Sequence, residues 1–173
     1  MKSKENQRDT RMFPLFVDIR GKSVVAVGGG RIASRRVKTL LDGEFGAVVK
    51  VISPEISEEM KIMLSQRGED ELCWIKASYD EKYLEGAHMV LACTSDDGVN
   101  RQIYDDCHRL GIMVNNASDK SLCDFHFPGV IIEDDAVIAF NGGGRDHRKV
   151  KLLRQRLEEW LSAGREKGNR YNL

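Results

Sequence analysis

Short apolar segments alternate with amphipathic segments along most of the chain. Each apolar segment has the length of a buried strand, and each amphipathic segment repeats apolar residues every three or four positions, as one face of a helix does. The predicted strands are 23–27, 48–53, 72–77, 88–94 and 112–117. The predicted helices are 31–41, 55–67 and a third that begins at a cap, Asp96 or Asp97, and ends at Gly111. This alternation is typical of a parallel sheet with helices on both faces.

The order of the elements predicts a Rossmann-like α/β fold. Crossovers between parallel strands are right-handed, so the five strands should form a doubly wound parallel sheet in the order 3-2-1-4-5. In such a sheet, ligands bind where the strand order reverses, outside the carboxyl ends of the strands.

The alternation stops after Asn115, and the remaining pattern differs. Two apolar runs, 130–132 and 136–140, flank three acidic residues and predict an antiparallel hairpin. An isolated hairpin is marginally stable in water, so this one needs a partner surface. A second copy of the chain is the simplest source, and packing on its own sheet is the alternative. A short C-terminal amphipathic helix follows, and its ending, 164–173, is expected to fray.

The stretch VVAVGGGRIASRR joins the first predicted strand to the first predicted helix. Its spacing is G-x-G-x-x-A, with Gly28, Gly30 and Ala33 at the three marked positions. The first glycine permits a tight turn, the second lets the backbone approach a pyrophosphate, and the alanine lets the helix pack closely on the strand. The amino end of a helix also attracts phosphate. The turn therefore predicts a dinucleotide site, and a glycine turn required only by sterics is the alternative.

The second strand lacks the acidic end that often binds the adenosine ribose. Glu55 is close but follows Pro54, and Ser53 offers a hydroxyl instead. This position has no arginine that could receive a 2′-phosphate, so the sequence favours NAD over NADP.

Charge and composition exclude several other classes of protein. Lys+Arg and Asp+Glu both number 27, which argues against a nucleic-acid partner. No apolar run is long enough to span a membrane, and the polar start, 1–11, lacks a signal-peptide pattern. The four cysteines and four histidines lack the spacing of a metal site, so we expect reduced thiols in a cytoplasmic protein.

Three motifs occur together in a family-specific order. They are the glycine turn with its basic helix, TSDDGVN after the fourth strand, and N-x-x-D…C-D-F-x-F-P after the fifth. With them, 12–145 resembles the precorrin-2 dehydrogenase family, the N-terminal module of sirohaem synthase, some members of which are also sirohydrochlorin ferrochelatases. The resemblance implies NAD-dependent oxidation of precorrin-2 to sirohydrochlorin by a homodimer that is joined through the hairpin region.

The resemblance also implies roles for individual residues. Asp119 corresponds to the family's catalytic aspartate. The positions implied to bind NAD, together with those inferred above, are Gly28, Gly30, Arg31, Ile32, Ser53, Pro54, Glu55 and Thr94. The implied domains are an NAD-binding Rossmann domain at 12–118, a dimerisation and active-site hairpin at 119–145 and a helical tail at 146–173, after a disordered lead-in at 1–11.

The chain departs from the family after the hairpin. NGGGRDH stands where bifunctional members often carry SSGGTSP, and the C-terminal region is shorter. Iron insertion therefore stays an open expectation, with Asp124 and His126 as candidates that could equally be structural. The residues expected to bind the substrate's carboxylates, or else to form an ordinary solvated basic surface, are Lys120, Arg145, Arg148, Lys149 and Lys151. A non-catalytic NAD(H) sensor is the alternative function.

Overall fold

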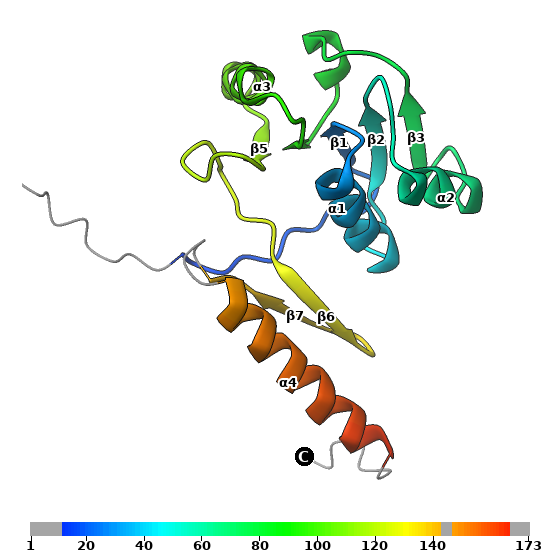
Figure 1. The fold of residues 1–173 in the computed structure, drawn as a ribbon, viewed down its shortest axis with the longest axis vertical. Helices are drawn as coiled ribbons and strands as arrows, with labels where there is room; N and C mark the ends of the chain where they lie inside the picture. Colours follow the sequence, from blue (N-terminus) through cyan, green and yellow to red (C-terminus); the bar gives the residue numbers. More distant parts are fainter. Residues whose placement is uncertain (1–11, 143–146, 167–173) are drawn as a thin grey trace, which may run out of the picture.

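A five-stranded parallel sheet forms the larger part of the molecule in the computed structural model, which describes residues 12–142 and 147–166 (Figure 1). Its strands are β1 (Ser23–Val27), β2 (Val48–Ile52), β3 (Leu72–Ile75), β4 (Met89–Ala92) and β5 (Met113–Asn116). The order is β3-β2-β1-β4-β5, and all four pairings are parallel. Both the strand order and the Rossmann-like class predicted from the sequence are confirmed. The expected lead-in 1–11 lies outside the described residues.

Helices cover both faces of this sheet. The helical elements are α1 (Arg31–Asp42), α2 (Glu58–Gln66), the short 3₁₀ helix η1 (Glu81–Leu84) and α3 (Asp97–Leu110). In β1, Val24 and Ala26 pack with α1 and α2, whereas Val25 and Val27 pack with η1 and α3. Alternate residues of a strand point to opposite faces, so the valine-rich run is buried on both sides. Each buried valine contributes about 1.5–3 kcal/mol relative to exposure.

The ends of α3 follow the sequence signals. The Asp96 side chain caps the helix, because its Oδ1 accepts from the backbone nitrogens of Gly98 at 2.8 Å and Val99 at 3.0 Å. Gly111 ends the helix with φ of +69°, in the left-handed region that glycine enters without strain. Of the two proposed caps, Asp96 is therefore the one used.

The start of α2 corrects the sequence-based boundary. A helix was predicted from Glu55, with Pro54 in the first turn, but α2 begins at Glu58. The Ser57 hydroxyl accepts from the backbone nitrogen of Met60 at 3.2 Å, and this cap fixes the later start. Residues 53–57 are instead a loop that lies against the glycine turn, as the contacts described below show.

Three strands end at one level of the sheet. Val27 pairs with Ala92, and Ala92 pairs with Asn116. The loops that follow β1, β4 and β5 therefore leave the sheet side by side. With strands about 4.8 Å apart, the glycine turn and the loop after β5 start roughly 10 Å from each other.

The predicted hairpin is also present. β6 (Gly129–Glu133) and β7 (Ala136–Phe140) pair antiparallel, and Asp134 adopts φ of +51° in the turn between them. The C-terminal helix α4 (His147–Glu166) lies along the hairpin and packs on β6 (Figure 1). The 20 residues of α4 lie within the expected tail 146–173, and the helix continues through the first three residues of the ending that was expected to fray. No helix in the described parts of the chain is long and apolar enough to cross a membrane.

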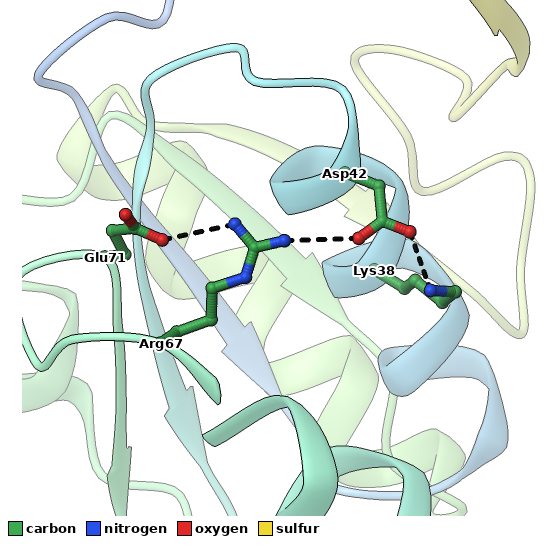
Figure 2. Close-up of polar contacts among 4 residues, drawn as sticks. All are labelled: Lys38, Asp42, Arg67 and Glu71. Atoms are coloured by element: carbon green, nitrogen blue, oxygen red, sulfur yellow. Dashed lines mark hydrogen bonds and ion pairs between the residues drawn. The ribbon is translucent and has the colours of Figure 1, made fainter. Parts of the chain in front are cut away.

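A line of ion pairs joins elements at the opposite edge of the sheet from the glycine turn (Figure 2). Arg67 follows α2 and lies between two carboxylates: its guanidinium is 3.3 Å from Asp42 at the end of α1 and 3.3 Å from Glu71 before β3. Lys38 pairs with the other oxygen of Asp42 at 2.6 Å. Arg67 thus links the end of α1, 25 residues away in the sequence, to the segment between α2 and β3.

Replacing Arg67 should have a small but measurable effect on stability. We expect Arg67→Gln to lower the free energy of unfolding by about 0.5–1 kcal/mol, since exposed pairs are weak and a network is at the upper end of their range. The loss should shrink in 1 M NaCl, which screens exposed charges. Urea denaturation at low and high salt measures it.

Lys61→Gln is the matched control. It removes a pair with Glu58 that lies within α2 and joins no other element. An equal loss for both variants, or a loss for Arg67→Gln that salt does not change, would contradict the linking role.

Candidate functional site

At two of the three glycine positions after β1, the protein's own backbone leaves no room for a side chain. Gly28 has φ of +111°, and a Cβ there would lie 2.5 Å from the carbonyl oxygen of Cys93. At Gly29 a Cβ would collide with the carbonyl oxygen of Glu55. Gly28 therefore permits the turn, as predicted, and Gly29 lets the loop after β2 lie directly on it.

Gly30 is different from its two neighbours. Its φ is −83°, which any residue adopts, and a Cβ there would meet no atom of the described chain within 4 Å. Neither backbone strain nor crowding thus explains a glycine at this position. The space beside Gly30 is open for a ligand to approach the backbone.

The first turn of α1 offers to that space backbone donors that have no partner among the described residues. Gly30 is its N-cap and gives no side-chain hydrogen bond. By contrast, α2, η1 and α3 are capped by the side chains of Ser57, Asp80 and Asp96. The free N–H groups of Arg31 and its neighbours, together with the helix dipole, therefore favour an anion at this point.

A pair of serines, one of them buried, holds the turn together, and the sequence reasoning missed it. Ser34, fully buried in α1, donates its hydroxyl to the Gly30 carbonyl at 3.1 Å and lies 2.8 Å from the Ser57 hydroxyl. The backbone nitrogen of Ser57 in turn donates to the Gly29 carbonyl at 2.8 Å. A signal was available, because Ser57 precedes the acidic pair Glu58-Glu59 and so reads as a helix cap.

The loop after β2 brings the proposed ribose-binding residues beside the glycine turn. Ser53 is buried, and its hydroxyl donates to the Glu55 carbonyl at 2.6 Å, so it shapes the loop. Pro54 and the Glu55 side chain are exposed. Of the three, Glu55 therefore presents a free polar group to solvent near the start of α1, where Arg31 and Ile32 are also exposed.

The loops after β4 and β5 form the other side of the site. Thr94 is partly buried, and its backbone nitrogen and hydroxyl both donate to the side chain of Asn100, at 3.1 and 2.8 Å. Asn100 was not among the predicted site residues, although it is the last residue of the TSDDGVN motif.

Asp119 lies in the loop after β5, half-buried, with its carboxylate held by one neighbour. Oδ1 accepts from the Ser121 backbone nitrogen at 2.8 Å and from the Ser121 hydroxyl at 2.7 Å. Within the described chain, Oδ2 accepts no hydrogen bond. The two bonds from Ser121, with a smaller effect of the nearby Arg101 charge, lower the pKa of Asp119 below its ordinary value of 3.8. The group is therefore an ionised carboxylate at neutral pH.

A pocket of about 240 Å³ opens beside Asp119. Its lining residues are Asp97, Arg101, Asn116, Ser118, Asp119 and Leu122. Asn116 is only 4% exposed, and its Nδ2 has no hydrogen-bond partner among the described residues. An unsatisfied buried donor is costly, so this amide can bind an acceptor that a ligand brings.

The thiols near the site are poor nucleophiles. Burial raises the pKa of both Cys93 and Cys123, so they stay protonated at neutral pH.

The other candidates are more dispersed. Asp124 binds within the fold: its Oδ1 is 3.0 Å from His108 Nε2, and its Oδ2 accepts from the Val114 backbone nitrogen at 2.9 Å. His126 is partly buried, and Lys120 is exposed next to Asp119. Arg148, Lys149 and Lys151 are exposed on α4, and Arg145 lies outside the described residues.

Comparisons with known proteins agree with this geometry. A family model described as "Putative NAD(P)-binding" matches residues 15–129. The chain belongs to this NAD(P)-binding family. The match includes the whole parallel sheet, and the open, uncapped turn at Gly30 fits the diphosphate of such a cofactor.

Curated relatives and a solved structure are similar to this chain as well. Siroheme synthase of Psychrobacter sp. (strain PRwf-1) is 36% identical over 88% of the chain, and siroheme synthase of Photorhabdus laumondii is 33% identical over 86%. The chain spans about 30% of the length of each of these two relatives. The structure of SirC, precorrin-2 dehydrogenase, matches with a TM-score of 0.68 and 26% identity, over 86% of this chain and 70% of that one.

Alanine substitutions one residue apart should separate the structural glycine from the ligand-binding one. We expect Gly30→Ala to leave the melting temperature unchanged but to weaken NAD binding about tenfold or more, because a methyl group would block charge-assisted bonds to the diphosphate. Gly29→Ala should instead lower the free energy of unfolding by about 1–3 kcal/mol through overpacking. Calorimetric titration and thermal denaturation measure the two effects.

Gly29→Ala is the control, because it adds the same methyl group at a neighbouring position that the protein itself crowds. If Gly30→Ala binds NAD as tightly as the unmodified protein, the open space at Gly30 is not the diphosphate site.

Proposed function

We propose that this chain is an NAD-dependent dehydrogenase that oxidises precorrin-2 to sirohydrochlorin. The observation that carries the proposal is the uncapped start of α1, beside Gly30, at the same edge of the sheet as the Asp119 carboxylate. The likeness to SirC, precorrin-2 dehydrogenase, and to siroheme synthases supports this choice of substrate.

Residues on both sides of the strand-order reversal would hold the dinucleotide. The N–H groups of Arg31 and Ile32 would bind the diphosphate above Gly30, and the Glu55 carboxylate would accept from the adenosine ribose. No basic residue occurs between Ser53 and Ser57, and the exposed Glu55 would repel a 2′-phosphate. These features favour NAD over NADP.

The chemistry requires the substrate to lose a hydride and a proton. When bound, the nicotinamide ring accepts the hydride. Asp119 would take the proton, because Ser121 occupies only Oδ1 and leaves Oδ2 available. The lowered pKa keeps this carboxylate in its proton-accepting form across the neutral range. Thr94, in the loop after β4, would line the space between the cofactor and Asp119.

Cations near Asp119 would orient the acidic substrate. Precorrin-2 carries eight carboxylates. Lys120 follows Asp119 in the loop, and Arg101 of α3 lines the pocket beside Asp119. Arg148, Lys149 and Lys151 would add charge from α4. We confine the proposal to the dehydrogenase, because Asp124, one of the two candidates for iron insertion, is bound to His108 and to the backbone of β5.

A second copy of the chain would cover the hairpin region. Segment 12–17, β6 and α4 together expose apolar side chains that a solvated surface rarely gathers. They are Met12, Phe13, Leu15, Phe16, Val17, Ile132, Leu152, Leu153 and Trp160. A bond of 3.3 Å from Asn141 Nδ2 to Met12 Sδ brings the N-terminal segment against the end of the hairpin. We infer a homodimer joined through this surface.

Asp119→Asn tests the catalytic role. The substitution keeps the oxygen that accepts from Ser121 but removes the proton acceptor, so kcat for precorrin-2 oxidation should fall about 100-fold or more. Affinity for NAD should not change. Sirohydrochlorin absorbance measures the rate, and calorimetry measures NAD binding.

Asp97→Asn, in the same pocket, is the matched control and should retain normal turnover. Full activity in Asp119→Asn would remove that residue from the mechanism. An unmodified protein that binds NAD but never converts precorrin-2 would favour the non-catalytic NAD(H) sensor.

Phe16→Glu tests the dimer. Phe16 is 68% exposed in the single chain, so a buried charge at a dimer interface should convert a particle of twice 19.5 kDa into one of 19.5 kDa. Light scattering after size-exclusion chromatography measures the mass. Ile62→Glu, at an exposed apolar residue of α2, should leave the dimer intact. A monomeric unmodified protein would overturn the inference.

A further inference from the structure

Asn100 is a fully buried polar residue that contacts two loops of the site at once. It lies in the first turns of α3 and is 0% exposed. Its Oδ1 accepts from the backbone nitrogen and the hydroxyl of Thr94, at 3.1 and 2.8 Å. Its Nδ2 donates to the Thr94 carbonyl at 3.0 Å and to the Ser118 hydroxyl at 3.2 Å. One side chain thus binds the loop after β4 and the loop after β5.

The orientation of this amide is fixed by its partners. A rotation that exchanged Oδ1 and Nδ2 would set donor against donor at the Thr94 nitrogen and acceptor against acceptor at the Thr94 carbonyl. Both donors and the acceptor of Asn100 are used, so the residue is fully satisfied without solvent. Asparagine is a poor residue for a helix interior, and the four bonds account for its presence here.

The hydrogen bonds continue from Ser118 to the backbone of Asp119, in the loop after β5. Because the Ser118 oxygen accepts from Asn100, its own hydrogen can go to Asn116 Oδ1, 2.9 Å away. The same Asn116 oxygen accepts from the backbone nitrogens of Ser118 at 2.9 Å and Asp119 at 3.1 Å. A continuous series of hydrogen bonds therefore runs from Thr94 through Asn100, Ser118 and Asn116 to the backbone of Asp119.

We propose that Asn100 is a positioning residue, which sets the distance between the cofactor-side loop at Thr94 and the carboxylate of Asp119 through the hydroxyl of Ser118. The inference rests on the proposed dehydrogenase function. Hydride and proton must leave the substrate with the cofactor and the carboxylate held in one geometry, and a displacement of about 1 Å can cost about 100-fold in rate.

This role is distinct from a purely structural one because its two halves can be separated. The hydrogen bonds between Asn100 and Thr94 hold the loop after β4 in place, and this is a structural role. Ser118, by contrast, is exposed, and its hydroxyl adds the connection to the loop after β5. Removing that hydroxyl leaves the backbone bonds of Asn116 Oδ1 in place, so the fold should tolerate it.

Ser118→Ala, measured in the full chain with precorrin-2 and NAD, is the decisive experiment. We expect kcat to fall about tenfold or more, with the calorimetric affinity for NAD unchanged, because the spacing of the two loops relaxes. The melting temperature should fall only slightly, since one N–H of Asn100 loses its partner while the rest of the fold is kept. Ser118→Thr keeps the hydroxyl and should restore kcat. Ser65→Ala removes a comparable hydroxyl, which donates to the Ile62 carbonyl in α2, and should change nothing.

Asn100→Ala should lower kcat at least as much, and Ser118→Ala keeps the inference testable if that buried variant does not fold. Normal kcat in Ser118→Ala would overturn the inference, as would a loss of kcat that Ser118→Thr shares. An inactive unmodified protein would contradict the proposed function itself. An active protein with an unaffected Ser118→Ala would contradict only the role of Asn100.

Discussion

Three backbone hydrogen bonds at the carboxyl ends of the strands determine the rest of the structure. The first residue after each strand still donates to its neighbour strand: Gly28 to Ile52, Cys93 to Val27 and Ala117 to Ala92, each at 2.8 Å. The parallel ladder therefore extends by one residue into each loop before the chain is free to turn. All three loops begin at the carboxyl ends of the strands, so the glycine turn, Thr94 and Asp119 lie along the same edge of the sheet.

The steric constraint at Gly28 follows from the same bonds. The Cys93 backbone lies so close to Gly28 that no side chain fits, and Gly29 is crowded by the loop after β2 in the same way. Gly30 escapes both constraints, so no contact of the described chain requires a glycine there. The fold thus requires Gly28 and Gly29, whereas Gly30 and the uncapped start of α1 are what the proposed diphosphate site would use.

The sequence was sufficient for features that depend on local signals. Periodicity identified every strand of the sheet and its order, and Asp96 and Gly111 marked the ends of α3. It failed where a long-range contact decides. Pro54 and Glu55 suggested an early helix start, but the Ser57 cap begins α2 later and the bond of the Ser57 backbone to Gly29 holds the residues before it in a loop. Ser34 and Asn100 were missed for the same reason, since each acts through a partner that only the folded chain brings near.

The low pKa of Asp119 is compatible with the proposed chemistry for a specific reason. A carboxylate that accepts two bonds from Ser121 is a weak base and would remove few protons from a neutral carbon acid. In a dehydrogenation, however, loss of hydride leaves an electron-poor substrate, whose remaining proton becomes far more acidic. A weak base that is always ionised then suffices, and it avoids being protonated between turnovers. The bonds from Ser121 thus hold a carboxylate that is ionised at neutral pH and that, in the proposed reaction, needs to accept only a proton that loss of hydride has made acidic.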